Sequence, residues 1–289
     1  MFSRQRAILR LIQNEGGAIA RLRLVKLAFL LSRERAAPPA ALYNFVPYKH
    51  GPFSFTLYHE LRVLGRDGWV AEQEHDVEVA EAPHLEIAYL DKAFMNLIDE
   101  VSGRHRSVPT PQLLDRVYHD YPWFTLNSES PKKRAVSRPE AETAVYTVGY
   151  EGIMVDALLD HLLQKGIRRL IDVRCNPIAR RYGFHKSTLC KLCSDVGIEY
   201  MHFPALGVPS VWRTDLSDQA AYDRLFRRYV KEILPKQQTV VQKVASLVKE
   251  IPSVLMCMEA AHDCCHRSKL GAELSCLTSL PVVELRQQQ

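Results

Sequence analysis

The chain has 289 residues, of which 47% are hydrophobic and 25% charged, as in a folded protein of two ordinary domains, and this composition excludes a largely disordered chain. No apolar run approaches the roughly 20 residues that span a bilayer, and the N-terminal sequence is amphipathic, so we expect a cytoplasmic protein without a signal peptide or membrane contact. A net charge of +5 gives only weak support for a polyanionic partner, and seven cysteines, all between Cys175 and Cys276, argue against a disulfide framework.

The first hundred residues predict a small helical domain with a β-wing. Residues 4–14 and 20–33 have helical periodicity, and a third helix is expected over 54–64 with Ser54 as its N-cap. Two glycines then lead into a strand-rich stretch over 77–89. The order helix, helix, turn, helix and wing predicts a winged helix-turn-helix domain over residues 1–101.

Two motifs of this part, RLVKLAFL at 23–30 and YKHGPFS at 48–54, resemble the YwgA-like winged-helix proteins. The resemblance implies that the helix from Ser54 is a recognition helix in contact with DNA. The predicted DNA-binding residues are Lys49, His50, Thr56, His59 and Arg62. Winged helices also dock proteins, so DNA contact and protein docking both remain open, as does a homo-oligomer.

Residues 102–143 are expected to connect two domains, because they contain five prolines and the basic run at 132–134. A short helix is expected over 111–119. The aromatic cluster at 118–124 should pack on a domain, which leaves 126–143 as the flexible part.

From residue 144 to 289 short apolar runs alternate with helical patterns, which predicts an α/β domain with a mostly parallel sheet and flanking helices. The expected strands are 144–148, 170–174, 199–203, 253–256 and 281–285.

Three of these strands end in chemically rich sequences: Tyr150-Glu151, Asp172-Val173-Arg174, and the segment from Cys257 to Arg267. Ligands of open α/β sheets bind at the carboxyl ends of strands, so we expect the three ends to form one cleft. There Asp172 and Glu259 would form a carboxylate pair, and two arginines would hold an anion. The alternative for the Asp–Arg motif is a structural ion pair.

The ordered motifs of this half resemble the domain-of-unknown-function 488 family over about residues 145–289. The resemblance rests on TVGYEG at 147–152, DVR at 172–174 with Pro177, Arg181 with Gly183-Phe184 and Leu189, Tyr200 with Leu206-Gly207, and Cys257, Glu259 and Cys265-His266-Arg267. It implies a compact α/β domain and a set of site positions, but no reaction.

The cysteines allow two rival interpretations. Cys190 and Cys193 have the spacing of zinc ligands, and Cys265 with His266 would complete a structural zinc site. The same pair fits small core residues on an amphipathic helix, and we expect neither a metal nor a cofactor. Cys257 would be a nucleophile only as a thiolate, and a buried inert thiol is the simpler expectation.

P-loop and GxGxxG motifs are absent from the sequence, so ATP hydrolysis and dinucleotide redox chemistry have no support. A carboxylate–arginine cleft with aromatic side chains suits hydrolysis of an N-glycosidic or related bond in a nucleic acid or nucleotide. The predicted catalytic residues are Asp172, Glu259 and His266, and the predicted substrate- or phosphate-binding residues are Tyr150, Arg174, Arg181, Phe184, Tyr200 and Arg267. The alternatives are a DNA-binding regulator that senses a small anion, and an adaptor that docks a protein.

Overall fold

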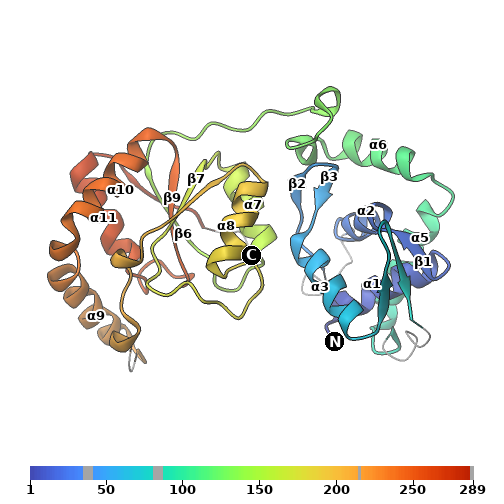
Figure 1. Ribbon diagram of the computed structural model, residues 1–289, viewed down its shortest axis with the longest axis horizontal. Helices are drawn as coiled ribbons and strands as arrows, with labels where there is room; N and C mark the ends of the chain where they lie inside the picture. Colours follow the sequence, from blue (N-terminus) through green and yellow to red (C-terminus); the bar gives the residue numbers. More distant parts are fainter. Residues whose placement is uncertain (35–41, 81–86, 214–215, 287–289) are drawn as a thin grey trace. The chain divides into compact units, whose positions relative to one another are not determined.

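The computed structural model describes residues 1–34, 42–80, 87–213 and 216–286, and it divides into two compact units (Figure 1). We call Met1–Ser137 unit 1 and Arg138–Gln289 unit 2. Among the described residues, no helix is both long enough and apolar enough to cross a membrane.

Unit 1 is mainly helical. Its helices are α1 (Ser3–Asn14), α2 (Arg21–Leu31), α3 (Phe55–Arg66), α5 (Lys92–His105) and α6 (Thr110–Asp120). Its strands are β1 (Ala18–Ala20), β2 (Val46–Tyr48), β3 (Gly51–Phe53), β4 (Val70–Glu72) and β5 (Asp76–Val79). One buried hydrophobic core joins these helices, with leucines and isoleucines of α1 and α2 at its centre.

The order of elements in unit 1 agrees with the order expected for a winged helix. Helices α1, α2 and α3 precede the antiparallel pair β4–β5, and β1 pairs with β5 to complete a three-stranded sheet. The side chain of Ser54 accepts a hydrogen bond from the Leu57 amide and caps α3, as predicted. Of the strand expected over 77–89, only its first residues are in β5, and 81–86 lie outside the described residues.

Residues 102–137, expected as part of the connector, lie in unit 1. Helix α6 contributes Leu113 and Val117 to the hydrophobic core. The aromatic cluster after it packs against Phe29 of α2, with ring centroids 4.9 Å away for Tyr121 and 4.8 Å away for Phe124. Burial of these rings attaches the segment to unit 1.

Unit 2 contains the predicted α/β fold. Its five parallel strands are β6 (Val145–Gly149), β7 (Arg169–Asp172), β8 (Glu199–His202), β9 (Ser253–Cys257) and β10 (Val282–Glu284). The strand order is β10-β6-β9-β7-β8. The inner strands are buried along nearly their whole length, as parallel strands with two covered faces require.

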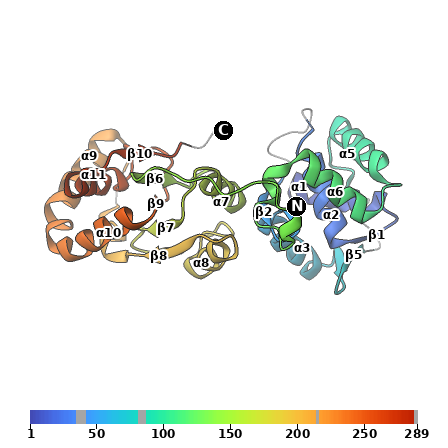
Figure 2. The same cartoon turned by 90° about the horizontal axis from the view of Figure 1, so that it is seen from above.

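Helices cover both faces of this sheet. They are α7 (Val155–Gln164), α8 (Lys186–Asp195), α9 (Gln219–Glu232), α10 (Gln238–Glu250) and α11 (Arg267–Thr278). Helices α7 and α8 lie on one side, and α9, α10 and α11 lie on the other (Figures 1 and 2). The α/β fold expected for this half is therefore confirmed.

The strand order places a topological switch point between β6 and β9. The chain leaves β6 through α7 toward β7, whereas it leaves the neighbouring strand β9 through α11 toward β10 on the opposite side. In open α/β sheets the ligand crevice lies at such a point, outside the carboxyl ends of the two strands. The topology thus predicts that a ligand site is formed by the residues after Gly149 and Cys257.

Candidate functional site at the carboxyl edge of unit 2

The segments after β6 and β9 touch each other directly. The amides of Tyr150 and Glu151 both donate to the carbonyl oxygen of Met258, at 3.1 and 2.9 Å. A Cβ atom on Gly149 would overlap the carbonyl oxygen of Glu259, so this close approach requires a glycine. The strand ends therefore converge at one edge, as the sequence motifs predicted.

At the end of β7, Asp172 and Arg174 form a buried ion pair. The carboxylate of Asp172 accepts from Nε of Arg174 at 2.8 Å, from Nη2 at 2.5 Å, and from the Tyr200 hydroxyl at 2.7 Å. Nη1 of Arg174 donates to the Tyr150 hydroxyl and to the Phe184 carbonyl, both at 2.9 Å. Burial opposes the charge of Arg174, but the bonds to Asp172 and its charge outweigh burial and raise the pKa of the guanidinium. Both groups are engaged inside the protein.

Two of the aromatic residues predicted to bind substrate, Tyr150 and Phe184, stack on each other. The rings of Tyr150 and Phe184 lie 4.1 Å apart and are nearly parallel, and both side chains are buried. Tyr200 is half-buried, and burial followed by the charge of Asp172 raises the pKa of its hydroxyl. The hydroxyls of Tyr150 and Tyr200 and the carbonyl oxygen of Phe184 hold the Asp172–Arg174 pair in place.

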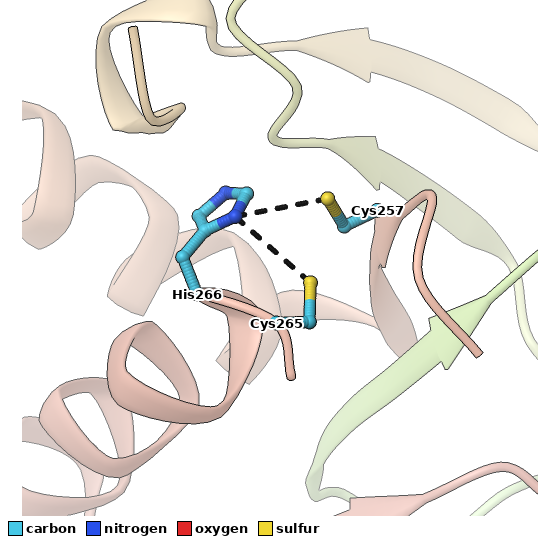
Figure 3. A group of neighbouring side chains, drawn as sticks. All are labelled: Cys257, Cys265 and His266. Carbon is cyan, nitrogen blue, oxygen red and sulfur yellow. Dashed lines mark hydrogen bonds between the residues drawn. The ribbon is translucent and has the colours of Figure 1, made fainter. Parts of the chain in front are cut away.

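A thiol–imidazole cluster lies beside this pair (Figure 3). Nδ1 of His266 is 3.7 Å from Sγ of Cys257 and 3.9 Å from Sγ of Cys265, and all three residues are buried. Cys257 comes from the end of β9, and the other two directly precede α11. A hydrogen bond from Cys265 lowers the pKa of the Cys257 thiol well below its usual range despite burial, whereas burial raises that of Cys265. The three side chains could hold a metal ion.

Glu259 completes this cluster. Its Oε2 atom lies 3.0 Å from the sulfur of Cys257 and 3.0 Å from that of Cys265, and its Oε1 accepts from Arg213 at 3.1 Å. Burial raises the pKa of the Glu259 carboxyl, and the charge of Cys257 raises it further. Its carboxylate is engaged by the thiols and by an arginine that sequence reasoning missed.

Arg267, predicted to bind phosphate, is fully buried. Its guanidinium donates to the carbonyl oxygens of Glu259 and Ala260, the latter at 2.9 Å. These bonds hold the loop after β9 from the protein interior. Because the guanidinium is buried, a substrate in solvent cannot reach it.

A pocket of about 510 Å³ opens at the switch point, a size suited to a small ligand. It is lined by Gly149, Glu151, Gly152, Ile153, Ala260, Ala261, His262, Asp263, Glu284, Leu285 and Arg286. Three carboxylates thus face one space. Burial and then the charge of Arg267 lower the pKa of His262, so its imidazole is neutral near pH 7.

Arginines flank this acidic pocket. Arg286 pairs with Glu284 at 2.8 Å, and Arg181 donates to the carbonyl oxygen of Ile153 at 2.7 Å. Both arginines are exposed. Of the predicted anion-binding arginines, only Arg181 therefore lies at the solvent surface beside the pocket.

The cysteine pair with zinc spacing does not join the cluster. Cys190 is exposed and Cys193 is buried on α8, and burial raises the pKa of the Cys193 thiol. Among the described residues the group with metal-binding geometry is Cys257, Cys265 and His266, without either of them. In the part of the chain that the structure describes, Cys190 and Cys193 therefore do not gather with Cys265 and His266 as the spacing would require.

The DNA-binding residues predicted in unit 1 have different environments. Lys49 pairs with Glu129 at 2.9 Å, and His50 lies 4.0 Å from the same carboxylate. Thr56 is buried in the first turn of α3. His59 is half-buried and Arg62 is exposed, and both lie on the outer side of α3.

The wing of unit 1 is acidic. Glu74, Asp76 and Glu78 are exposed on β5 and the turn before it. Carboxylates at these positions repel phosphates, so a DNA contact would have to avoid the wing.

Sequence reasoning missed the main pocket residues. Glu151 stands in the motif after a strand but was not among the predicted site residues. Its signal in the sequence was a carboxylate directly after a buried strand. His262 and Asp263 lie within the segment from Cys257 to Arg267, where the family motif directed attention to their neighbours. Arg213 and Glu284 had no local signal, because folding alone brings them to this edge.

Comparison with known proteins identifies only the second half. No curated protein and no solved structure matched the chain. The resemblance of the first 90 residues to YwgA-like proteins stays a prediction. The family described as "Domain of unknown function DUF488" matches residues 154–274, which confirms the DUF488 resemblance predicted for the C-terminal half.

Proposed function

We propose that unit 2 is a hydrolase that cleaves an N-glycosidic or related bond of a nucleotide or nucleic acid in the pocket at the switch point. The observation that carries this proposal is the gathering of Glu151, Asp263 and Glu284 around one pocket, with exposed arginines beside it. Cleavage of a glycosidic bond passes through a positively charged, oxocarbenium-like state, which nearby carboxylates stabilise.

The residues take distinct roles in this reaction. Glu151 and Asp263 are exposed and supply the carboxylates that stabilise positive charge on the sugar and activate water. His262 lines the same pocket, and because burial lowers the pKa of its imidazole it can accept and transfer a proton. Arg181 and Arg286 bind the phosphates outside the acidic centre.

Asp172 and Glu259, first expected as the catalytic pair, are assigned other roles. Asp172 is buried and accepts from two side chains, so it positions Arg174 and Tyr200.

For unit 1 we propose DNA contact through the outer side of α3, where His59, Arg62 and Arg66 lie. Arg62 and Arg66 offer positive charge there, whereas burial lowers the pKa of His59 and leaves its ring to donate or accept hydrogen bonds. Such contacts release counterions from DNA, so retention should weaken steeply with salt. An Arg62→Glu variant should weaken retention at low salt, whereas retention unaffected by salt or by this change would favour docking of a protein.

The test of the hydrolase is direct product analysis. The purified chain is incubated with single-stranded and double-stranded DNA, RNA and nucleoside monophosphates, and released bases are separated by chromatography. We expect base release that falls by about 10²–10⁴-fold in Glu151→Gln, the range for loss of an acid–base group. Asp195→Asn, an exposed carboxylate on α8, is the matched control. Equal release by both variants would overturn the assignment of Glu151.

A further inference from the structure

The thiol–imidazole cluster has the arrangement of a metal site. The ligand atoms of Cys257, Cys265 and His266 all lie within 4.8 Å of one another (Figure 3). In a tetrahedral zinc site with Zn–S of about 2.3 Å and Zn–N of about 2.0 Å, sulfur and nitrogen are separated by about 3.5 Å. The distances of 3.7 and 3.9 Å between Nδ1 and the two sulfurs are only a few tenths longer.

The orientation of His266 favours ligation. Its Nε2 lies 3.1 Å from the carbonyl oxygen of Val173, which can only accept, so Nε2 carries the proton. The lone pair of Nδ1 therefore faces the two sulfurs. A ring nitrogen that donates to a backbone carbonyl while the other meets the metal is the usual second contact of a ligating histidine.

Glu259 lies beside the two sulfurs but outside the group of three ligands. Its Oε2 is 3.0 Å from each sulfur, on a side chain that is 22% exposed. The partial exposure offers an access path for an ion to an otherwise buried cluster. Arg213, which contacts the other oxygen of Glu259, offsets part of the negative charge that two thiolates and a carboxylate would bring.

We propose that Cys257, Cys265 and His266 bind one zinc ion. Two thiolates and an imidazole are ligands that soft or borderline metals prefer, and three protein ligands leave the fourth tetrahedral position to a water molecule. On binding, the hydrated ion exchanges three of its waters for two Zn–S bonds and one Zn–N bond, and any proton still on either thiol passes to solvent. The ion would join the end of β9 to the start of α11 and so hold the loop that lines the pocket. This assignment goes beyond the proposed hydrolase and does not depend on it.

The site differs from the zinc site that spacing alone suggested. Its ligands lie at 257, 265 and 266, without a Cys-x-x-Cys pair. A strand end and a helix start supply them, and only the fold brings them together.

The test uses the full chain, reduced and treated with a chelator, and then titrated with Zn²⁺ or Co²⁺. We expect one ion per chain by elemental analysis, with a tetrahedral Co²⁺ spectrum that includes thiolate-to-cobalt charge transfer. Cys257→Ser and Cys265→Ser should each weaken zinc affinity at least 100-fold, whereas Cys190→Ser and Cys276→Ser, which alter exposed thiols, should leave it unchanged.

Glu259→Gln guards against a folding artefact, because it keeps all three buried ligands. It should bind Co²⁺ and retain the charge-transfer band, because Glu259 is not one of the ligands. Wild-type chain without that band, or loss of binding in Cys190→Ser or Cys276→Ser, would overturn the site whatever the hydrolase assay shows.

Discussion

Replacing Asp172 by Asn should destabilise unit 2 strongly without creating a cavity. The amide has the size of the carboxylate but no charge, and Arg174 is only 4% exposed. Two bonds from Arg174, at 2.8 and 2.5 Å, and one from Tyr200, at 2.7 Å, lose their charged acceptor. Breaking one partner of a buried pair costs about 3–5 kcal/mol, because the remaining charge stays buried without compensation.

Hydrogen exchange measured by mass spectrometry suits this prediction, because it reports on β6, β7 and β9 separately from unit 1. Asp172→Asn should lower the free energy of opening at these strands by the stated amount, whereas the exposed control Asp195→Asn should change it by less than about 0.5 kcal/mol. Combining Asp172→Asn with Arg174→Met should cost less than the sum of the two single changes. Unaltered protection of β7 in Asp172→Asn would refute the structural role of the pair.

Three further predictions concern other buried contacts. Burial lowers the pKa of Lys26 from 10.5 to about 7, and its Nζ donates to the Pro52 carbonyl at 2.8 Å. The unfolded chain therefore binds more protons between these values, and the stability of unit 1 should rise from pH 7 toward pH 10 by at most about 1.4 kcal/mol per unit. The free energy of unfolding, measured with urea at several pH values, should rise less with pH in Lys26→Met than in the wild-type chain. The same dependence on pH in both chains would contradict this prediction. Gly149→Ala should displace the Glu259 carbonyl and reduce the yield of folded chain, measured by gel filtration, whereas wild-type yield would contradict the close approach. Arg267→Met should increase proteolysis of the loop after β9, because two carbonyls lose their donor, and unchanged cleavage would speak against this role.

Much of the fold could be predicted because the local patterns are strong. In unit 2, β7 and β9 are short buried runs with apolar centres, and polar residues stand at or just after the end of each strand. Helix α5 was missed, although Asp91 caps it and Phe94, Ile98 and Val101 form its buried stripe. The stretch before it was predicted as strand-rich, and the helical period of 92–105 runs across the boundary expected at residue 101.

The candidate site was only partly predictable. The motifs located the carboxyl edge, since polar residues after buried strands must meet there. They offered the ion pair of Asp172 with Arg174 only as an alternative, and the structure shows that pair. They could not show that Arg267 points into the protein, because a sequence does not state which way a charged side chain faces. Glu284 reaches the pocket only because β10 pairs with β6, a contact between residues far apart in the chain.

The central claim is that the pocket at the switch point carries the reaction and that the buried Asp172 network supports it. Single-turnover base release, expressed per folded molecule, tests this claim through two variants. Glu151→Gln removes a pocket carboxylate, and Tyr200→Phe removes one donor to Asp172. We predict that Glu151→Gln lowers the rate at least 100-fold, as loss of an acid–base group does, while Tyr200→Phe stays within a few-fold of wild type. A wild-type rate in Glu151→Gln together with a large loss in Tyr200→Phe would contradict the account.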